Sequence, residues 1–218
     1  CKLYNNFNIL RYIKVVIIDP KSPHEINFNN VYKAFHKKVI LNNISFTVAE
    51  KEILAVIGPS GTGKSTILKL ICGLMEPDSG EVILNSNKMS MAFQFSALLN
   101  FLTVKENIAL PLRKNTNMNE KEISERVTTV LDMVGLIDTG NLFPAELSGG
   151  MQKRVGFARA IVTTPDIILY DEPTSGLDPM TTNMIVQDIL HLRRMRPVAN
   201  VIVTHDMHVI DEAADKVL

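Results

Sequence analysis

Short apolar runs separated by turn residues organise the first part of the chain. From Ile26 onward β-type runs alternate with turns, and two such runs are residues 26–31 and 44–48, the second with its apolar side chains on one face. Residues 53–57 are apolar at every position, which is typical of a strand buried on both faces of a parallel sheet. A glycine-rich loop and a helix expected over residues 64–74 follow, so this part predicts the strand, loop and helix order of an α/β protein.

The middle of the chain changes to a helical pattern. Residues 81–84 and 89–93 still predict strands, but after Gln94 the apolar residues recur at helical spacing. Asn119 and Glu122 have the spacing of a capping box, which marks the start of a helix. We therefore expect a helical subdomain in this part of the chain.

Strands and helices alternate again in the last third. Residues 166–170 and 200–204 predict apolar strands, and residues 180–194 between them predict a helix. The whole pattern predicts an α/β core with an inserted helical subdomain. It contains no internal repeat and no low-complexity linker.

Composition and charge limit the classes of partner. With 218 residues and 46% hydrophobic residues, the chain is expected to form one domain, or one domain with an inserted subdomain. Lys plus Arg and Asp plus Glu each number 23, and this balance disfavours binding to nucleic acid. Cys1 and Cys72 lie far apart, which favours a reducing compartment over a disulfide framework.

No apolar run reaches the roughly eighteen residues that a membrane-spanning helix needs. The longest candidate, residues 13–18, is interrupted by Lys14 and lacks the layout of a signal peptide. We expect that the chain does not cross a membrane. Residues 1–25 are expected to be an N-terminal lead-in, with an extra strand or a loose segment favoured over a membrane-touching arm.

Residues 58–66 match the phosphate-loop pattern G-x-x-x-x-G-K-[ST] between a buried strand and a helix. The glycines allow backbone N–H groups to turn toward a triphosphate, and the helix start points its partial positive charge at the same place. Lys64 can neutralise the outer phosphates, and Ser65 can offer its hydroxyl to Mg²⁺. The alternative is a glycine-rich connection without a ligand. The candidate nucleotide-binding residues are Gly58, Ser60, Gly61, Thr62, Gly63, Lys64, Ser65 and Thr66.

Two adjacent carboxylates, Asp171 and Glu172, follow the apolar strand of residues 166–170. The carboxyl ends of strands are where open α/β sheets collect their ligands. Because consecutive strand residues point in opposite directions, one carboxylate suits the Mg²⁺ shell and the other suits the γ-phosphate and an attacking water. The alternative is a solvated acidic turn, but a phosphate loop in the same chain needs an acid at its magnesium site.

A second helix start can also bind an anion. Residues 147–152 read LSGGMQ and precede a helical pattern, so they combine free backbone N–H groups with a hydroxyl. One chain therefore has two phosphate-binding helix starts, separated by the inserted subdomain.

The order of these motifs resembles the ATP-hydrolysing subunits of ABC transporters. The phosphate loop, Gln94, the LSGGMQ segment, the acid pair, residues 175–178 and His205 follow one another as in that family. The resemblance covers residues 26–218. It implies a RecA-like P-loop NTPase core with an N-terminal antiparallel β subdomain and an inserted α-helical subdomain.

The resemblance also implies domain boundaries. Residues 26–94 and 153–218 would form the α/β core, and residues 95–152 the helical subdomain that ends in the signature segment. In that family two copies pack head to tail, so that the signature of one copy closes over the ATP in the phosphate loop of the other. This arrangement would explain why one chain has two anion sites.

Site roles follow from the resemblance, residue by residue. Glu172 would be the general base, His205 would hold the γ-phosphate, and Gln94 would sense Mg²⁺ and the attacking water. Ser65, Gln94 and Asp171 would serve the metal. The residues facing the partner's ATP would be Leu147, Ser148, Gly149, Gly150, Gln152 and Asp178.

Phe35 matches the position where the family stacks an aromatic ring on adenine. The residue there is often Tyr, so Phe keeps the stacking surface and loses the hydroxyl. The alternative is that Tyr32 and Phe35 are ordinary core aromatics.

The transporter type is suggested by residues 89–99, by Pro144-Ala145-Glu146-Leu147 before the signature, and by Tyr170. These segments look like the Mla-type phospholipid-transport ATPases and their plastid lipid-import relatives, which work with a permease and an MCE-domain lipid-binding protein. The resemblance implies that the permease docks near residues 94–102. Apolar residues there either line that groove or pack the subdomain core, and they are Phe95, Leu98, Leu99, Phe101 and Leu102.

The resemblance implies a peripheral protein on the cytoplasmic face of an inner membrane, or on the stromal face of a plastid inner envelope. The stretch from Glu81 to Gln94 is shorter than in the family, and the chain starts without Met and stops at Leu218 within the expected last strands. We therefore expect that segments are missing from this sequence, including a loop after Leu84. Residues 85–88 support no local conclusion.

Other readings are disfavoured. A GTPase would need an N-K-x-D segment, and residues 87–90 fail at the last position. A soluble ABC protein of translation or DNA repair would usually have two cassettes or a long coiled coil. A non-hydrolysing interaction module would have little use for Glu172 and His205. An ABC importer for another small solute remains open.

Overall fold

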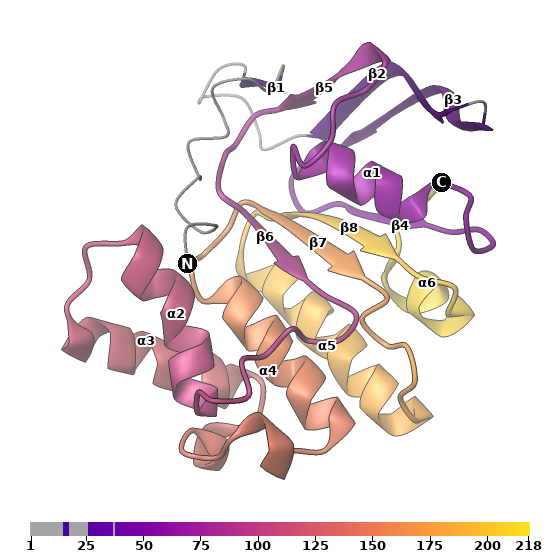
Figure 1. The fold of residues 1–218 in the computed structure, drawn as a ribbon. Coiled ribbons are helices and arrows are strands. Elements are labelled where there is room, and N and C mark those ends of the chain that lie inside the picture. The colour runs from indigo at the N-terminus through magenta and orange to yellow at the C-terminus, as the bar shows by residue number, and fades with distance from the viewer. Residues whose placement is uncertain (1–14, 18–25, 37) are drawn as a thin grey trace.

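The computed structural model describes residues 15–17, 26–36 and 38–218, which form two sheets with helices between and beside them (Figure 1). One sheet has the strand order β1-β5-β2-β3, and the other has the order β6-β7-β8-β4-β9. The strands of the first sheet are β1 (Val15–Ile17), β5 (Ser79–Leu84), β2 (Ile26–Phe35) and β3 (Lys38–Val48). Those of the second are β6 (Met89–Ala92), β7 (Ile167–Asp171), β8 (Ala199–Val203), β4 (Ile53–Val56) and β9 (Lys216–Val217).

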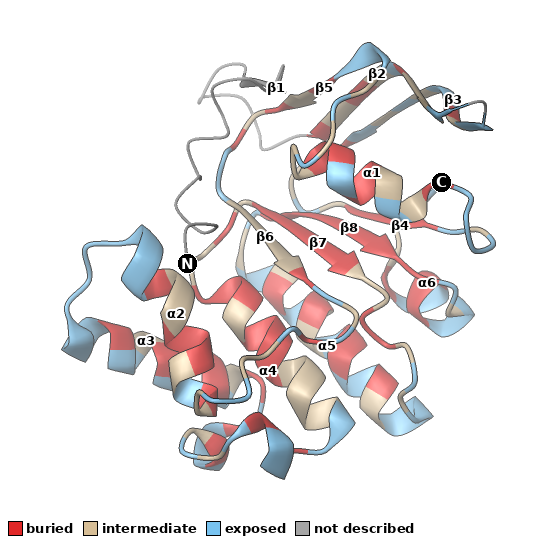
Figure 2. Ribbon diagram, viewed as in Figure 1, coloured by how far each residue is buried: buried red, intermediate tan, exposed pale blue. Residues whose placement is uncertain are grey.

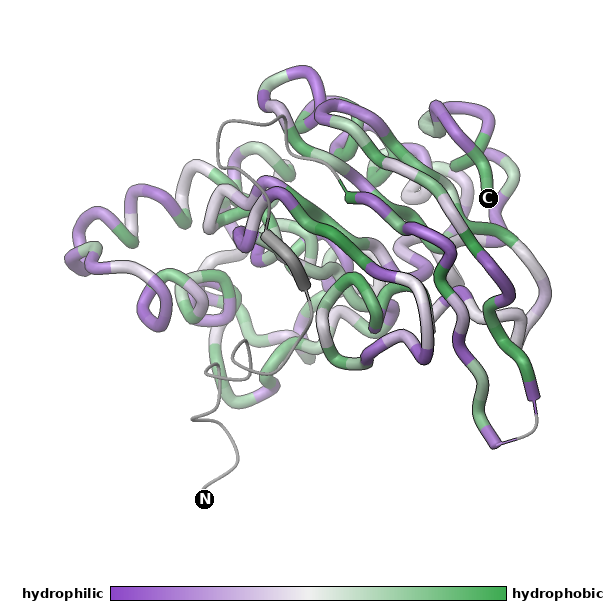
Figure 3. The backbone as a smooth tube through the Cα atoms, turned by 90° about the horizontal axis from the view of Figure 1, so that it is seen from above, coloured by the Kyte–Doolittle hydropathy of each residue, from purple (hydrophilic) through white to green (hydrophobic). Residues whose placement is uncertain are grey.

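The first sheet is mainly antiparallel and the second is parallel. β2 pairs antiparallel with both β3 and β5, whereas β1 pairs parallel with β5. Every pair in the second sheet is parallel. Hydropathy alternates along the β2–β3 hairpin, as expected for strands with one buried face (Figure 3).

The described residues form six α-helices beside the sheets. They are α1 (Lys64–Ile71), α2 (Val104–Asn115), α3 (Glu120–Met133), α4 (Gly149–Ile161), α5 (Pro179–Met195) and α6 (Met207–Ala213), with short 3-10 turns at Ile137–Thr139 and Pro144–Glu146. Helix α1 lies between the two sheets, and α4 and α5 cover the other face of the parallel sheet (Figure 1). No helix in the described part of the chain combines the length and apolar character that crossing a bilayer requires.

The central strands β4, β7 and β8 of the parallel sheet are buried, which explains their mainly apolar sequences (Figure 2). Along β7, Ile167 and Leu169 pack toward α1 and the antiparallel sheet, whereas Ile168 and Tyr170 pack toward α4 and α5. The Tyr170 hydroxyl donates a hydrogen bond to Asn200 Oδ1 at 3.2 Å, so its one polar atom is satisfied within this core. Two apolar layers therefore share one sheet and fix the positions of its carboxyl ends.

The predicted fold class is confirmed: an antiparallel β subdomain, a parallel P-loop core and a helical insertion are all present. Most predicted elements fall within a residue or two of those observed, but the strands predicted over residues 26–31 and 44–48 are too short, because β2 continues to Phe35 and β3 already begins at Lys38, where the two strands pair as a hairpin. The predicted helix over residues 64–74 is wrong at its end, because α1 stops at Ile71 and Gly73 adopts a left-handed φ of 65°. The strands expected over residues 53–57 and 89–93 each end one residue earlier.

Two further expectations concern the start of the chain and the helical subdomain. Of the lead-in, Val15–Ile17 forms the extra strand β1, and the remaining residues up to 25 lie outside the described residues. The capping box is confirmed: Asn119 Oδ1 accepts from the Glu122 N–H, and the Glu122 carboxylate accepts from the Asn119 N–H. β5 and β6 are joined by residues 85–88.

Candidate active site

A cleft of about 630 Å³ opens at the carboxyl ends of the parallel strands. The phosphate loop forms one wall, and the ends of β7 and β8 form the other. Its lining comprises Phe35, Lys38, Ile40, Ser60, Gly61, Gly63, Lys64, Ser65, Thr66, Gln94, Asp171, Glu172, Val203 and His205. The fold therefore brings together residues that lie far apart in the sequence.

The phosphate loop has the backbone shape that its glycines permit. Gly58, Gly61 and Gly63 have φ values of 142°, 82° and 108°, which side-chain-bearing residues rarely adopt. A Cβ atom on Gly63 would lie 2.8 Å from Ile40 Cγ2, so this position also lacks space for a side chain. The loop can therefore turn its N–H groups inward at the start of α1.

Lys64 is held over the phosphate loop. Its Nζ donates hydrogen bonds to the Gly58 carbonyl at 2.6 Å and to the Pro59 carbonyl at 3.0 Å. Thr62 Oγ1 donates to the same Pro59 carbonyl at 2.9 Å. These contacts place the ammonium group at the centre of the loop, where phosphate oxygens can replace the carbonyl oxygens as acceptors.

Asp171 ends β7 and faces the phosphate loop across the cleft. Burial raises the pKa of Asp171, and the negative charge of Glu172 raises it further, while Lys64 and Lys69 act in the opposite direction. A cation bound beside Asp171 would stabilise its charged carboxylate and so lower its pKa. Ser65 and Asp171 line the same cleft, so their hydroxyl and carboxylate oxygens fit Mg²⁺, which prefers one or two protein ligands together with phosphates.

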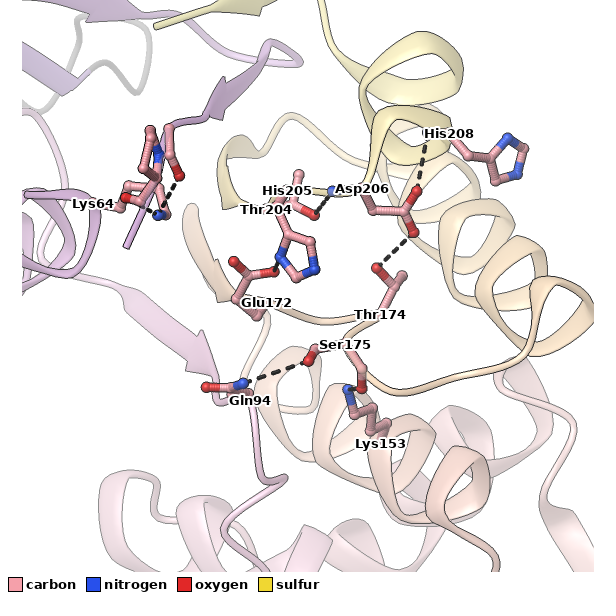
Figure 4. Close-up of polar contacts among 12 residues, drawn as sticks. Lys64, Gln94, Lys153, Glu172, Thr174, Ser175, Thr204, His205, Asp206 and His208 are labelled. Atoms are coloured by element: carbon pink, nitrogen blue, oxygen red, sulfur yellow. Dashed lines mark hydrogen bonds and ion pairs between the residues drawn. The ribbon is translucent and has the colours of Figure 1, made fainter. Parts of the chain in front are cut away.

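Glu172 has a strained backbone and a paired side chain. Its φ of 49° lies in the left-handed region, and its N–H donates to the Val203 carbonyl at 2.9 Å, which joins it to the end of β8. Glu172 Oε2 lies 2.8 Å from His205 Nδ1, with Glu172 14% and His205 70% exposed (Figure 4). The contact is a hydrogen bond when Nδ1 carries the hydrogen, and the described residues give the buried oxygen no other donor. The contact uses Nδ1, so Nε2 can donate to a ligand oxygen when both ring nitrogens carry hydrogens.

Gln94, which lines the cleft, meets the segment after Glu172. Gln94 Nε2 lies 3.5 Å from Ser175 Oγ, and Lys153 Nζ of α4 donates to the Ser175 carbonyl (Figure 4). Burial lowers the pKa of Lys153, and the Glu172 carboxylate raises it. Lys153 was not predicted from the sequence, because it lies just outside the LSGGMQ segment; Ser175 begins the 175–178 segment, but no role was assigned to it.

The signature segment lies outside this cleft. Ser148 is the N-cap of α4 and accepts a hydrogen bond from the Met151 N–H at 3.2 Å, and the space beside Gly149 is open. Leu147 is buried, and the Gln152 amide donates to the Pro144 carbonyl at 2.9 Å. The structure therefore separates the signature residues from the phosphate loop of the same chain.

Asp178 also lies away from the cleft lining, as the N-cap of α5. Its carboxylate accepts hydrogen bonds from the Thr181 hydroxyl and N–H, which lower the pKa of Asp178. Gly150 approaches Thr181 so closely that a Cβ atom would lie 2.5 Å from Thr181 Cγ2. The starts of α4 and α5 are thus packed against each other.

Phe35 lies at the end of β2 and lines the cleft with 41% of its surface exposed, which is not the environment of a core residue. Lys33 Nζ lies 5.8 Å from the centre of its ring and forms an ion pair with Asp78 at 2.6 Å. Asp78 also accepts a hydrogen bond from the Ala34 N–H at 2.8 Å. These contacts fix the strand end that presents the ring.

Phe35→Ala is expected to weaken ATP binding by about 1 to 3 kcal/mol, or roughly 5- to 150-fold in Kd, because one base-stacking surface is lost. Phe35→Tyr should keep the affinity within about threefold, since the ring is retained. Titration calorimetry with a non-hydrolysable ATP analogue measures both. Phe143→Ala is the control, because Phe143 is 44% exposed and lies outside the cleft lining. Equal affinities for Phe35→Ala and Phe143→Ala would exclude stacking on Phe35.

Comparisons with known proteins agree with this geometry. A family model described as ABC transporter matches residues 41–175. The chain is 40% identical over 224 residues to Protein TRIGALACTOSYLDIACYLGLYCEROL 3, chloroplastic, of Arabidopsis thaliana, covering 88% of the chain and 65% of that protein. It is 41% identical over 206 residues to the methionine import ATP-binding protein MetN of Carboxydothermus hydrogenoformans, covering 88% of the chain and 61% of that protein. The chain thus spans less than two thirds of each relative.

Solved structures show the same fold. A dimeric ATP-binding cassette in a post-hydrolysis state, bound to ADP and Pi, superposes with a TM-score of 0.76 at 34% identity, covering 86% of this chain and 91% of that one. A protein from Clostridium perfringens that is part of the ABC transporter complex cbiONQ superposes with a TM-score of 0.81 at 24% identity, covering 90% and 84%. At 24% identity, the similarity to the Clostridium perfringens protein concerns the fold alone.

Proposed function

The chain belongs to the ABC transporter family, and from that membership we propose that it binds and hydrolyses ATP to drive transport through a membrane permease. The observation that carries the proposal is the Glu172–His205 pair, which stands opposite the phosphate loop in one cleft. A carboxylate and an imidazole at that position suit the activation of water and the binding of a γ-phosphate.

Several residues that line the cleft have a part in the proposed reaction. Backbone N–H groups of the phosphate loop and Lys64 bind the β- and γ-phosphates, and Mg²⁺ held by Ser65 and Asp171 would neutralise their charge. Glu172 accepts a proton from water as its oxygen attacks the γ-phosphorus, and the bond to the bridging oxygen of ADP breaks. With hydrogens on both ring nitrogens, His205 would donate from Nε2 to a γ-phosphate oxygen while Nδ1 donates to Glu172. The products are ADP and inorganic phosphate.

The working unit of the proposed enzyme is a head-to-tail dimer of this chain. Ser148, Gly149 and Gly150 lie outside the cleft of their own chain, and Gly149 has open space beside it. A helix start with free N–H groups can bind the γ-phosphate that the other copy holds. The 34% identical cassette solved as a dimer with ADP and Pi supports this arrangement.

The proposed docking surface for the permease is the segment of residues 94–102. Phe95 and Phe101 are 85% and 76% exposed, which is unusual for large apolar side chains. Leu98 instead packs against the core of the helical subdomain, and Leu99 and Leu102 are partly buried. The two phenylalanines are therefore the groups that a membrane partner would cover. The protein would then sit peripherally at a membrane, on the cytoplasmic face of an inner membrane or the stromal face of a plastid envelope.

Phospholipid is the proposed cargo, with an MCE-domain protein as a further partner. The proposal rests on residues 89–99 and on the 40% identity to the plastid protein named for trigalactosyldiacylglycerol. Methionine-import proteins are equally similar, so overall identity does not decide between cargoes. An importer of another small solute and a soluble ABC ATPase are the alternatives.

The cargo proposal predicts the behaviour of the purified complex. The chain would be isolated with its copurifying membrane proteins, reconstituted into vesicles, and supplied with fluorescent phospholipid or with labelled methionine. We expect phospholipid movement and lipid-stimulated ATPase activity only with Mg-ATP, and an MCE-domain protein among the copurifying chains. ATPase activity that ignores phospholipid, with no lipid moved, would exclude this cargo; methionine uptake would identify the alternative.

A further inference from the structure

The loop that follows Gln94 has an unusual backbone conformation. Ser96 and Ala97 have φ values of 55° and 47°, which place two consecutive non-glycine residues in the left-handed region. Non-glycine residues adopt this region uncommonly, and a pair in succession needs support from its surroundings. The contacts that hold Ser96 and Ala97 in this conformation therefore show which parts of the protein the loop is attached to.

Arg159 of α4 supplies that support from the underside of the loop. Its Nη1 donates to the Ala97 carbonyl at 2.8 Å and its Nη2 donates to the Ser96 carbonyl at 2.7 Å. Within residues 26–36 and 38–218, Arg159 forms no ion pair with a carboxylate. Burial lowers the pKa of Arg159, so the two carbonyl oxygens replace the water that a guanidinium normally keeps. The planar fork of Arg matches two adjacent acceptors.

Gly156 allows the loop to lie directly on the helix. It precedes Arg159 by three residues and shares its helix face. A Cβ atom on Gly156 would lie 3.2 Å from both Cα and Cβ of Ser96, so a larger residue would push the loop away. The loop therefore contacts α4 through a close backbone approach as well as through hydrogen bonds.

The far end of the loop is held by Asn107 of α2. Its Oδ1 accepts from the Leu99 N–H at 2.8 Å, and its Nδ2 donates to the Leu99 carbonyl at 3.1 Å. Asn107 is fully buried, which makes these bonds costly to break. The loop is thus fixed to α4 at Ser96 and Ala97 and to α2 at Leu99.

The near end of the loop carries Gln94, which lines the cleft. Gln94 lies against Ser175, and Lys153 of α4 holds the Ser175 carbonyl. Helix α4 therefore contacts Ser175 through Lys153, and it contacts the loop just after Gln94 through Arg159. The same helix begins at Ser148, the residue proposed to meet the ATP of the other copy.

We propose that Arg159 is a positioning residue for ATP hydrolysis: by fixing the left-handed loop on α4, it makes Gln94 move with the helix that begins at the signature serine. The inference rests on the proposed role of Gln94 in the reaction. Without the clamp, the loop would leave its strained conformation, and Gln94 would no longer follow α4. Nucleotide binding by the phosphate loop would remain, because Arg159 touches none of its residues.

The test compares three variants of the full chain. Arg159→Met removes the fork and keeps much of the volume, Arg159→Lys keeps the charge, and Arg126→Met is the matched control. Arg126 Nε also donates to a main-chain carbonyl, that of Val162 at 3.0 Å, and burial also lowers its pKa, but it lies away from the loop. Hydrogen exchange of peptides covering residues 95–102 reports loop order, and steady-state kinetics report kcat and KM for ATP.

In Arg159→Met we expect loop exchange to rise at least about tenfold and kcat to fall about 10- to 100-fold, with KM for ATP within about threefold of the parent. Arg159→Lys should lie between Arg159→Met and the parent, and Arg126→Met should leave loop exchange unchanged. Unchanged loop exchange in Arg159→Met would overturn the clamp. Faster exchange with an unchanged kcat would overturn its role in hydrolysis. If the parent itself hydrolyses no ATP, the proposed function fails, whereas the exchange measurement still decides the clamp.

Discussion

Glu172→Gln is expected to lower kcat for ATP hydrolysis by about 10² to 10⁴-fold, because the amide keeps the size of the side chain but cannot accept the proton of water. The position of Glu172 is set by its N–H bond to the Val203 carbonyl and by its left-handed φ, neither of which depends on the carboxylate. Affinity for ATP should therefore persist. A dimer that holds unhydrolysed ATP should accumulate and be visible by size-exclusion chromatography.

The control for this substitution is Glu212→Gln on α6. Glu212 is exposed and lies outside the cleft lining, so the same chemical change should leave kcat within about twofold. Turnover by Glu172→Gln within about tenfold of the parent would remove Glu172 from the role of general base. In that case His205, which pairs with Glu172 in the cleft, would be the next base to test.

Lys64→Met is expected to raise the Kd for ATP by roughly a hundredfold, because it removes about 3 kcal/mol of charge-assisted hydrogen bonding to the phosphates. Methionine keeps a similar length but has no ammonium group. The contacts of Nζ with the Gly58 and Pro59 carbonyls are lost too, so the loop itself should become more mobile. Titration calorimetry with a non-hydrolysable analogue and Mg²⁺ measures the affinity.

Lys69→Met on the same helix separates a local charge effect from a general one. Lys69 is exposed and does not line the cleft, although its charge helps to lower the pKa of Asp171. We expect a change in Kd of less than about threefold for this variant. Equal losses in Lys64→Met and Lys69→Met would mean that the net charge of α1, and not the placement of Lys64 in the loop, governs phosphate binding.

The parts of the site that were predicted from the sequence are those whose chemistry is local. The phosphate loop needs glycines and a lysine within nine consecutive residues, and the acid pair needs only an apolar strand before it. The capping box at Asn119 joins residues three positions apart. In such cases backbone geometry follows from residue types and short spacings, so the pattern by itself carries the prediction.

Contacts between distant elements could not be predicted in this way. Arg159 reaches a carbonyl 62 positions earlier in the chain, and nothing near it in the sequence indicates that partner. Ser96 and Ala97 have no intrinsic preference for the left-handed region, and packing against α4 overrides their ordinary tendency. Likewise, the role of Lys153 depends on where the segment after Glu172 returns to α4.

The sequence by itself therefore determined which chemical groups are present: a glycine-rich phosphate-loop pattern with its lysine, two adjacent acids after an apolar strand, the LSGGMQ segment before a helix, and the α/β order that carries them. The tertiary structure decided which groups meet. In the folded chain His205 Nδ1 lies against Glu172, and the Gln152 amide donates to the Pro144 carbonyl. Phe95 is exposed, and Arg159 of α4 holds the loop after Gln94. The reason is physical, since a residue's chemical type is set by its own atoms, whereas its partners are set by how two apolar layers pack on one shared sheet.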